Sequence, residues 1–204
     1  MSGVRSLKSE LQRHSLVVLV AAPRFLHRVY SLLKSLNLNL EVRMKGPGEE
    51  VPQALLYSRF AEILLAVWLS ELLTGGGHIR IGVDPGVHNV GLAILVGELI
   101  AYTGLLRSMN DVVELVGELQ GLRLYEELEV KVGYSKSSAR SVRELVRKLE
   151  ERGVSVKSVA EGEARRRVIL GDFTALYRKV TTHELDALRI ALYPTSKRYT
   201  GLPS

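Results

Sequence analysis

The chain has 204 residues, and 28 Lys and Arg against 22 Asp and Glu give a net charge of +6 and a pI near 9.6. Its 46% apolar and 25% charged residues exclude a disordered or collagen-like chain. The absence of cysteine excludes disulfide scaffolds, Cys-ligated zinc and thiol catalysis. Its charged start is not a signal peptide, and Arg59, Glu62 and Glu71 interrupt the apolar stretch 55–73. We therefore expect a cytoplasmic protein without a membrane segment, and the basic excess suggests a nucleic-acid partner.

The first 74 residues predict a small β-α-β-α segment of unknown role. Its elements are a strand at 15–22, a helix that begins at Pro23, an alternating strand at 38–45 and a long helix at about 53–73. The run Gly75–Gly77 follows and is the best linker candidate in the chain. We therefore predict two domains, residues 1–74 and residues 75–204.

The second domain begins with three strands that are joined by tight turns, which predicts an antiparallel meander. The predicted strands span 79–84, 90–96 and 98–106; they are followed by a helix at 109–120, a strand at 128–132, a helix at 139–149, a strand at 154–160 and a helix from Thr182. This order predicts a mixed α/β sheet, in which helical crossovers add parallel strands to the meander.

Two motifs in this domain resemble those of a known superfamily. IGVDPGVHNVGLAIL (Ile81–Leu95) resembles the opening strands of ribonuclease H-like proteins, and THELDALRIAL (Thr182–Leu192) resembles their closing helix. Within that superfamily, residues 79–193 look most like the RuvC Holliday-junction resolvases and the YqgF-like proteins. The resemblance implies a mixed five-stranded sheet flanked by helices, with the first strand central. It also implies a metal-dependent nuclease in which Asp84, His183 and Asp186 are ligands.

The residues themselves allow both a functional and a structural interpretation. Asp84 ends a strand of apolar and glycine residues, but Asp-Pro-Gly is also a good turn sequence. His183 and Asp186 are three residues apart and share a helix face, whereas Thr181 and Glu184 match a capping box. Capping explains Glu184, to which we assign no catalytic role, but it does not explain the shared face.

The predicted site departs from the resolvases at one position. They carry a glutamate on the fourth strand, where this chain has Val132 or Gly133. The YqgF-like proteins lack that glutamate and have an acid after the fifth strand instead, and Glu161 occupies this place. The alternative for Glu161 is an ordinary solvated loop acid.

The cofactor implied by the resemblance is Mg²⁺ or Mn²⁺. Two such ions about 4 Å apart activate the attacking water and stabilise the leaving oxygen, and several carboxylates must converge to hold them. We therefore expect Asp84, Glu161, His183 and Asp186 to meet at one end of the sheet.

Basic residues next to these acids are candidates for binding nucleic-acid phosphates. They are Lys136, Arg140 and Arg143 before and along one helix, and Arg165, Arg166 and Arg167 directly after Glu161. The alternative is a solvated helix face in which Arg147 and Lys148 pair with Glu151 and Glu144. Only four Asn and three Gln in the chain suggest adaptation to heat.

Two functional hypotheses follow. The first is a nuclease that hydrolyses phosphodiester bonds in a DNA junction or in structured RNA, either resolvase-like or RNA-processing. A resolvase that cuts two strands symmetrically needs a two-fold homodimer. The second is a catalytically inactive ribonuclease H-like protein that binds nucleic acid, which the missing glutamate favours.

Overall fold

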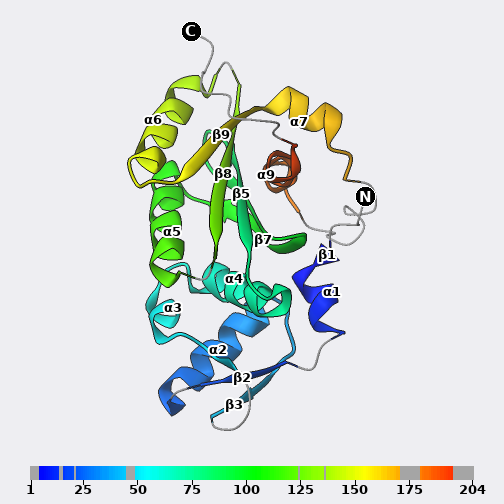
Figure 1. The fold of residues 1–204 in the computed structure, drawn as a ribbon, viewed down its shortest axis with the longest axis vertical. Helices are drawn as coiled ribbons and strands as arrows, with labels where there is room; N and C mark the ends of the chain where they lie inside the picture. Colours follow the sequence, from blue (N-terminus) through cyan, green and yellow to red (C-terminus); the bar gives the residue numbers. More distant parts are fainter. Residues whose placement is uncertain are drawn as a thin grey trace.

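The computed structural model describes residues 5–13, 16–20, 22–44, 49–123, 125–135, 137–170 and 180–194. Its centre is a six-stranded sheet with the order β1-β7-β6-β5-β8-β9 (Figure 1). The strands are β1 (Arg5–Ser6), β5 (His78–Pro85), β6 (Val90–Val96), β7 (Leu99–Leu106), β8 (Glu127–Tyr134) and β9 (Ser155–Ala160). β5, β6 and β7 are antiparallel neighbours, and β8 and β9 are added in parallel to β5.

The five strands β5–β9 confirm the predicted ribonuclease H-like fold, with β5 between β6 and β8. The prediction of five strands within residues 79–193 is confirmed, and β1 from the N-terminal segment adds a sixth strand that the sequence did not predict. It pairs in parallel with β7 through Arg5 and Ser6 opposite Leu99 and Ile100. A strand of two residues has no alternating pattern long enough to be recognised in a sequence.

Helices cover both faces of the sheet (Figure 1). On one face lie α4 (Ala61–Thr74), α5 (Met109–Leu122) and α6 (Ala139–Glu150), and on the other lies α9 (Thr182–Leu192). Alternation along β5 separates these layers, because Ile79, Ile81 and Val83 enter the core beneath α4–α6, whereas Gly82 faces α9. A short helix, α7 (Glu161–Arg167), follows β9 and packs through Ala164 on Val159 and Ile190.

The N-terminal segment contains more elements than the sequence predicts. They are α1 (Leu7–Leu11), β2 (Val17–Leu19), α2 (Pro23–Ser35), β3 (Glu41–Arg43), β4 (Glu49–Glu50) and α3 (Gln53–Tyr57). The strands β3-β2-β4 form a separate parallel sheet. The predicted two-domain division remains a prediction, although one buried core includes residues on both sides of the glycine run.

The long helix predicted at 53–73 is interrupted after Tyr57. Ser58 has an extended backbone, and its hydroxyl accepts a hydrogen bond of 2.8 Å from the amide of Phe60. Such local bonding by serine competes with the helical hydrogen bonds and accounts for the break. The second part, α4, is buried along most of its length, and none of the described helices is long and apolar enough to cross a bilayer.

Candidate metal and nucleic-acid site

Asp84 lies at the carboxyl end of the central strand β5. Pairing between β5 and β8 ends at Val83 and Val132, so Asp84 has a strand neighbour only on the β6 side, opposite Gly91. Asp84 is two residues after Gly82 and therefore faces the same side of the sheet, toward α9. In open α/β sheets, ligands bind at such carboxyl ends of strands.

Two glycines allow the beginning of α9 to approach this point closely. A Cβ on Gly82 would overlap the carbonyl oxygen of Ala187, and a Cβ on Gly91 would overlap that of His183. The helix begins with the predicted capping box, in which Thr181 accepts from the Glu184 amide and Glu184 accepts from the Thr181 amide. The cap and the glycines together fix the position of His183 beside β5.

His183 and Asp84 are in direct contact. Nδ1 of His183 lies 2.5 Å from Oδ2 of Asp84, in a hydrogen bond that the carboxylate accepts. The Asp84 side chain is 5% exposed and the His183 side chain 49%. Burial raises the pKa of Asp84; the hydrogen bond from His183 opposes this change, and the charge of Asp186 adds to it.

Glu161 reaches the same place from the first position of α7. Its Cγ would lie 3.2 Å from a Cβ on Gly133, so it occupies the space in front of that glycine. Burial raises the pKa of Glu161, and the charges of Asp84 and Asp186 raise it further, while Arg165 opposes them. Glu161 therefore interacts electrostatically with both aspartates, and it lies at a helix start rather than in a loop.

The structure resolves which residue of β8 faces this side. Gly133 faces α9 and Glu161, whereas Val132 lies in the core under α4–α6. Glu129, on the same side as Gly133, is paired with Lys131 and Lys157. We call Asp84, Glu161, Asp186 and His183 the acidic cluster.

Asp186 is held by two arginines. Its Oδ1 accepts from Nε of Arg165 at 3.2 Å and from Nη1 of Arg189 at 2.8 Å, and its Oδ2 accepts from Nη2 of Arg165 at 2.6 Å. The sequence predicts phosphate binding for Arg165 and contains no indication of this contact with Asp186. Residues 21 positions apart in different elements leave no local signal of their pairing.

The acidic cluster fits a divalent cation in its chemistry. Three carboxylates are suitable oxygen ligands for Mg²⁺ or Mn²⁺, and burial and mutual repulsion raise the pKa of both Asp84 and Glu161. As arranged, however, no group of three or more acidic or histidine side chains within the described residues could hold a metal ion. Arg165 and Arg189 supply the positive charge at Asp186 instead.

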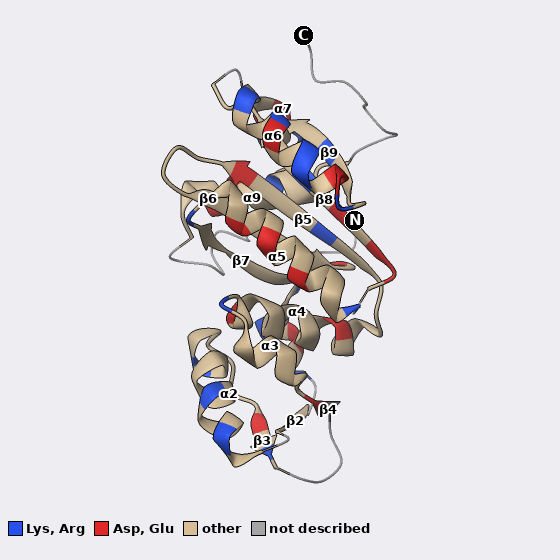
Figure 2. Cartoon of the chain, turned by 90° about the vertical axis from the view of Figure 1, so that its left-hand side faces the viewer, with Lys and Arg blue, Asp and Glu red and all other residues tan. Residues whose placement is uncertain are grey.

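The basic candidates form two exposed groups on α6 and α7, whose positions can be followed in Figure 2. Arg140 and Arg143 are exposed on α6, while Arg166 and Arg167 pair with Glu163 on α7. The expected pairs Arg147–Glu151 and Lys148–Glu144 are present. Lys136 lies outside the described residues.

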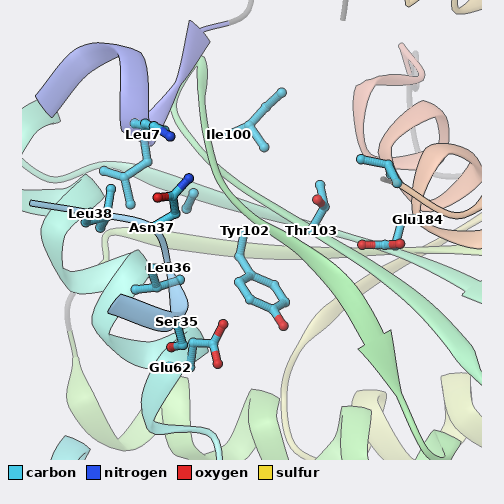
Figure 3. Close-up of a pocket in the computed structure, with 13 residues that line it drawn as sticks. Leu7, Ser35, Leu36, Asn37, Leu38, Glu62, Ile100, Tyr102, Thr103 and Glu184 are labelled. Atoms are coloured by element: carbon cyan, nitrogen blue, oxygen red, sulfur yellow. The ribbon is translucent and has the colours of Figure 1, made fainter. Parts of the chain in front are cut away.

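A pocket of about 640 Å³ lies beside β7, between α1, the residues after α2 and the start of α9 (Figure 3). Tyr102 lines it with Glu62 and Glu184; burial and these two carboxylates raise the pKa of Tyr102 to about 12. No residue of the acidic cluster lines this pocket, and its carboxylates would repel a phosphate.

Comparison with known proteins gives similarity in structure alone. No protein-family model matches the chain, and no curated protein matches it. The chain is similar to RuvC of T. thermophilus in complex with a Holliday junction substrate, with 17% identity and a TM-score of 0.42 over 56% of this chain and 90% of that one. A second Thermus thermophilus RuvC structure gives 15% identity with the same TM-score and the same coverage. The ribonuclease H-like fold of this chain is defined by its strand order, independently of these similarities.

Proposed function

We propose that this protein is a metal-dependent nuclease that hydrolyses phosphodiester bonds in branched or structured nucleic acid. The observation that carries the proposal is the meeting of Asp84 and His183 at the end of the central strand, within electrostatic reach of Glu161 and Asp186. Buried carboxylates that raise one another's pKa are unfavourable unless a cation or a proton neutralises them, and such groups gather at functional sites.

Asp84, Glu161 and Asp186 are the proposed ligands of Mg²⁺ or Mn²⁺, with His183 at the edge of the site. A bound divalent cation supplies Lewis-acid polarisation of a phosphoryl oxygen and makes water more acidic. The hydrogen bond from His183 orients the Asp84 carboxylate, and the cap at Thr181 fixes the helix that carries both His183 and Asp186. Arg140, Arg143 and Arg165–Arg167 are the proposed contacts for phosphates that flank the scissile bond.

A specific observation favours the second function, an inactive protein that binds nucleic acid. Gly133 stands where the resolvases carry a glutamate, and the Asp186 carboxylate is bound by arginines. In that case the ion pairs are the permanent arrangement of the cluster, and the basic residues alone bind the partner.

The two functions are separated by a cleavage assay on labelled substrates. Wild type is incubated with a four-way DNA junction, duplex DNA, single-stranded DNA and an RNA hairpin, in Mg²⁺, Mn²⁺ or EDTA. We expect cleavage that EDTA abolishes and that falls at least a hundredfold in Asp84→Asn and Glu161→Gln. Glu163→Gln is the matched control, because Glu163 lies on the same helix but pairs outward with Arg166.

The outcomes are distinct. Binding without cleavage under all these conditions would reject the nuclease and support the binding protein. Equal cleavage by wild type and Asp84→Asn would reject the acidic cluster as the site. Neither binding nor cleavage would reject both functions.

A further inference from the structure

Arg165 is the cation that the three carboxylates of the acidic cluster share. It donates two hydrogen bonds to Asp186, and the charges of Asp186, Glu161 and Asp84 all raise the pKa of its guanidinium. Its positive charge therefore serves the electrostatic purpose that a divalent cation would serve in the same place.

The two arginines on Asp186 differ in their freedom to leave. The Arg189 side chain is 24% exposed, and Arg189 is three residues after Asp186 on the same helix, so it stays next to its partner. The Arg165 side chain is 56% exposed and extends from α7. Ala164 anchors that helix against Val159 and Ile190, so the Arg165 side chain can rotate into solvent while the backbone of α7 stays in place.

We infer that Arg165 is a displaceable counter-ion, which occupies Asp186 in the metal-free protein and leaves it when a divalent cation binds. This inference rests on the proposed metal-dependent function and adds to it a competition between one side chain and the metal. Oδ2 of Asp186 accepts from Arg165 alone, so displacement of this one residue frees a carboxylate oxygen for the cation.

The freed guanidinium then becomes available to nucleic acid. Arg165 is next to Arg166 and Arg167, and a guanidinium that leaves a carboxylate is well suited to bind a phosphate with the same two donors. Metal and nucleic acid would thus each favour the outward position of Arg165. Thermodynamic linkage requires that each then raises the affinity for the other.

Calorimetric titration with Mn²⁺ tests the competition without any activity measurement. Arg165→Gln removes the competing charge, so we expect its Mn²⁺ affinity to exceed that of wild type about five- to a hundredfold, the range of a charge-assisted hydrogen-bonded pair. Arg165→Lys keeps the charge but loses the two-pronged contact, and its affinity should lie between the two. Arg147→Gln is the control and should match wild type, because Arg147 pairs with Glu151 on α6 and lies outside the acidic cluster.

A second titration contains duplex DNA with phosphorothioate linkages, which slow cleavage. We expect the DNA to tighten Mn²⁺ binding in wild type and to have a smaller effect in Arg165→Gln. Thermal melting of each variant without metal shows whether it is folded.

Each result decides a different point. Mn²⁺ affinity in folded Arg165→Gln equal to or below that of wild type would overturn the counter-ion role while leaving the metal-dependent function standing. An unfolded Arg165→Gln would also overturn it, because Arg165 would then be a structural requirement. Absence of Mn²⁺ binding in all four proteins would overturn the proposed metal-dependent function, and with it this inference.

Discussion

Glu161 lies in front of Gly133, with its Cγ 3.2 Å from the point that a Cβ on that glycine would occupy. The absence of a side chain on β8 thus makes room for a carboxylate from α7. An acid at position 133 and the observed position of Glu161 would compete for the same space. Gly133 therefore leaves the space that Glu161, the acid after the fifth strand, occupies. This explains how the acidic cluster can contain three carboxylates although β8 contributes none of them.

Gly133→Ala tests this relationship. The added methyl group overlaps the end of the flexible Ile190 side chain and presses on Glu161, so we expect a loss of about 1–2 kcal/mol in unfolding free energy. For a chain of this size that loss corresponds to a decrease of about 2–8 °C in Tm. Displacement of Glu161 should also lower the Mn²⁺ affinity about tenfold, because loss of one ligand contact worth about 1.4 kcal/mol changes the affinity by that factor. Calorimetric titration measures this decrease.

Gly121→Ala is the matched control for that substitution. Gly121 is helical, and nothing lies within 4 Å of an added Cβ, so alanine should leave Mn²⁺ binding unchanged and stabilise α5 by up to about 1 kcal/mol. Unchanged Mn²⁺ affinity in Gly133→Ala would show that Glu161 is not a ligand.

Five strands of the main sheet, β5 to β9, could be predicted because each carries its own signal. Apolar runs separated by tight turns placed β5, β6 and β7 within one residue of their observed bounds. The capping residues Thr181 and Glu184 likewise indicated the start of α9. These features depend on residues that are close in sequence, so they can be recognised without knowledge of the fold.

The details that decide the chemistry were not predictable, because they depend on contacts distant in sequence. β1 is defined only by its pairing with β7, and the contact of Arg165 with Asp186 joins two helices. Gly82 and Gly91 are ordinary strand residues in the sequence, and only the packing of α9 shows why they lack side chains. The sequence identified Asp84, Glu161 and Asp186 as candidate metal ligands, but it did not show that Arg165 and Arg189 bind Asp186.

Lys131 stabilises the far end of α9, the helix that carries His183 and Asp186. Its buried ammonium donates to the carbonyl oxygens of Ala191 and Tyr193 at 3.1 and 2.8 Å and faces Glu129 at 3.5 Å. Burial lowers the pKa of Lys131, and Glu129 opposes that change. Lys131→Met should cost about 3–5 kcal/mol, measured by chemical denaturation, because two carbonyls lose their donor and Glu129 loses a partner in the interior.

Lys148→Met is the comparison for Lys131. Lys148 pairs with Glu144 on the more exposed surface of α6, and loss of such a pair should cost no more than about 0.5 kcal/mol. Similar losses for the two lysines would contradict the role given to Lys131.

Glu71 predicts a pH dependence of stability that is independent of the acidic cluster. Both of its carboxylate oxygens are buried without a hydrogen-bond partner in the described structure, and burial, followed by the charge of Glu126, raises its pKa to about 7. The folded state thus binds the proton more tightly than the unfolded chain. The stabilisation is complete below pH ~4.5 and is lost as the pH rises toward 7, by about 1–3 kcal/mol.

Melting curves of wild type and Glu71→Gln between pH 5 and 8 measure this effect. The Tm of wild type should fall relative to that of Glu71→Gln as the pH rises, because glutamine cannot ionise. Glu150→Gln, at an exposed position of α6, should follow wild type. Parallel curves for wild type and Glu71→Gln would show that Glu71 is not the titrating group.

The exposed arginines of α6 predict how salt affects nucleic-acid binding. Arg140 and Arg143 are exposed, whereas Arg147 on the same helix is paired with Glu151 at 2.5 Å. If both arginines contact phosphates, the double variant Arg140→Ala/Arg143→Ala should reduce the magnitude of the slope of log K against log [salt] by about 2, since each contact contributes about 0.9 on duplex DNA. Fluorescence anisotropy with a labelled DNA junction from 50 to 200 mM salt measures these slopes. Arg147→Ala should retain the wild-type slope, and a double variant with the wild-type slope would place the phosphate contacts elsewhere on the protein.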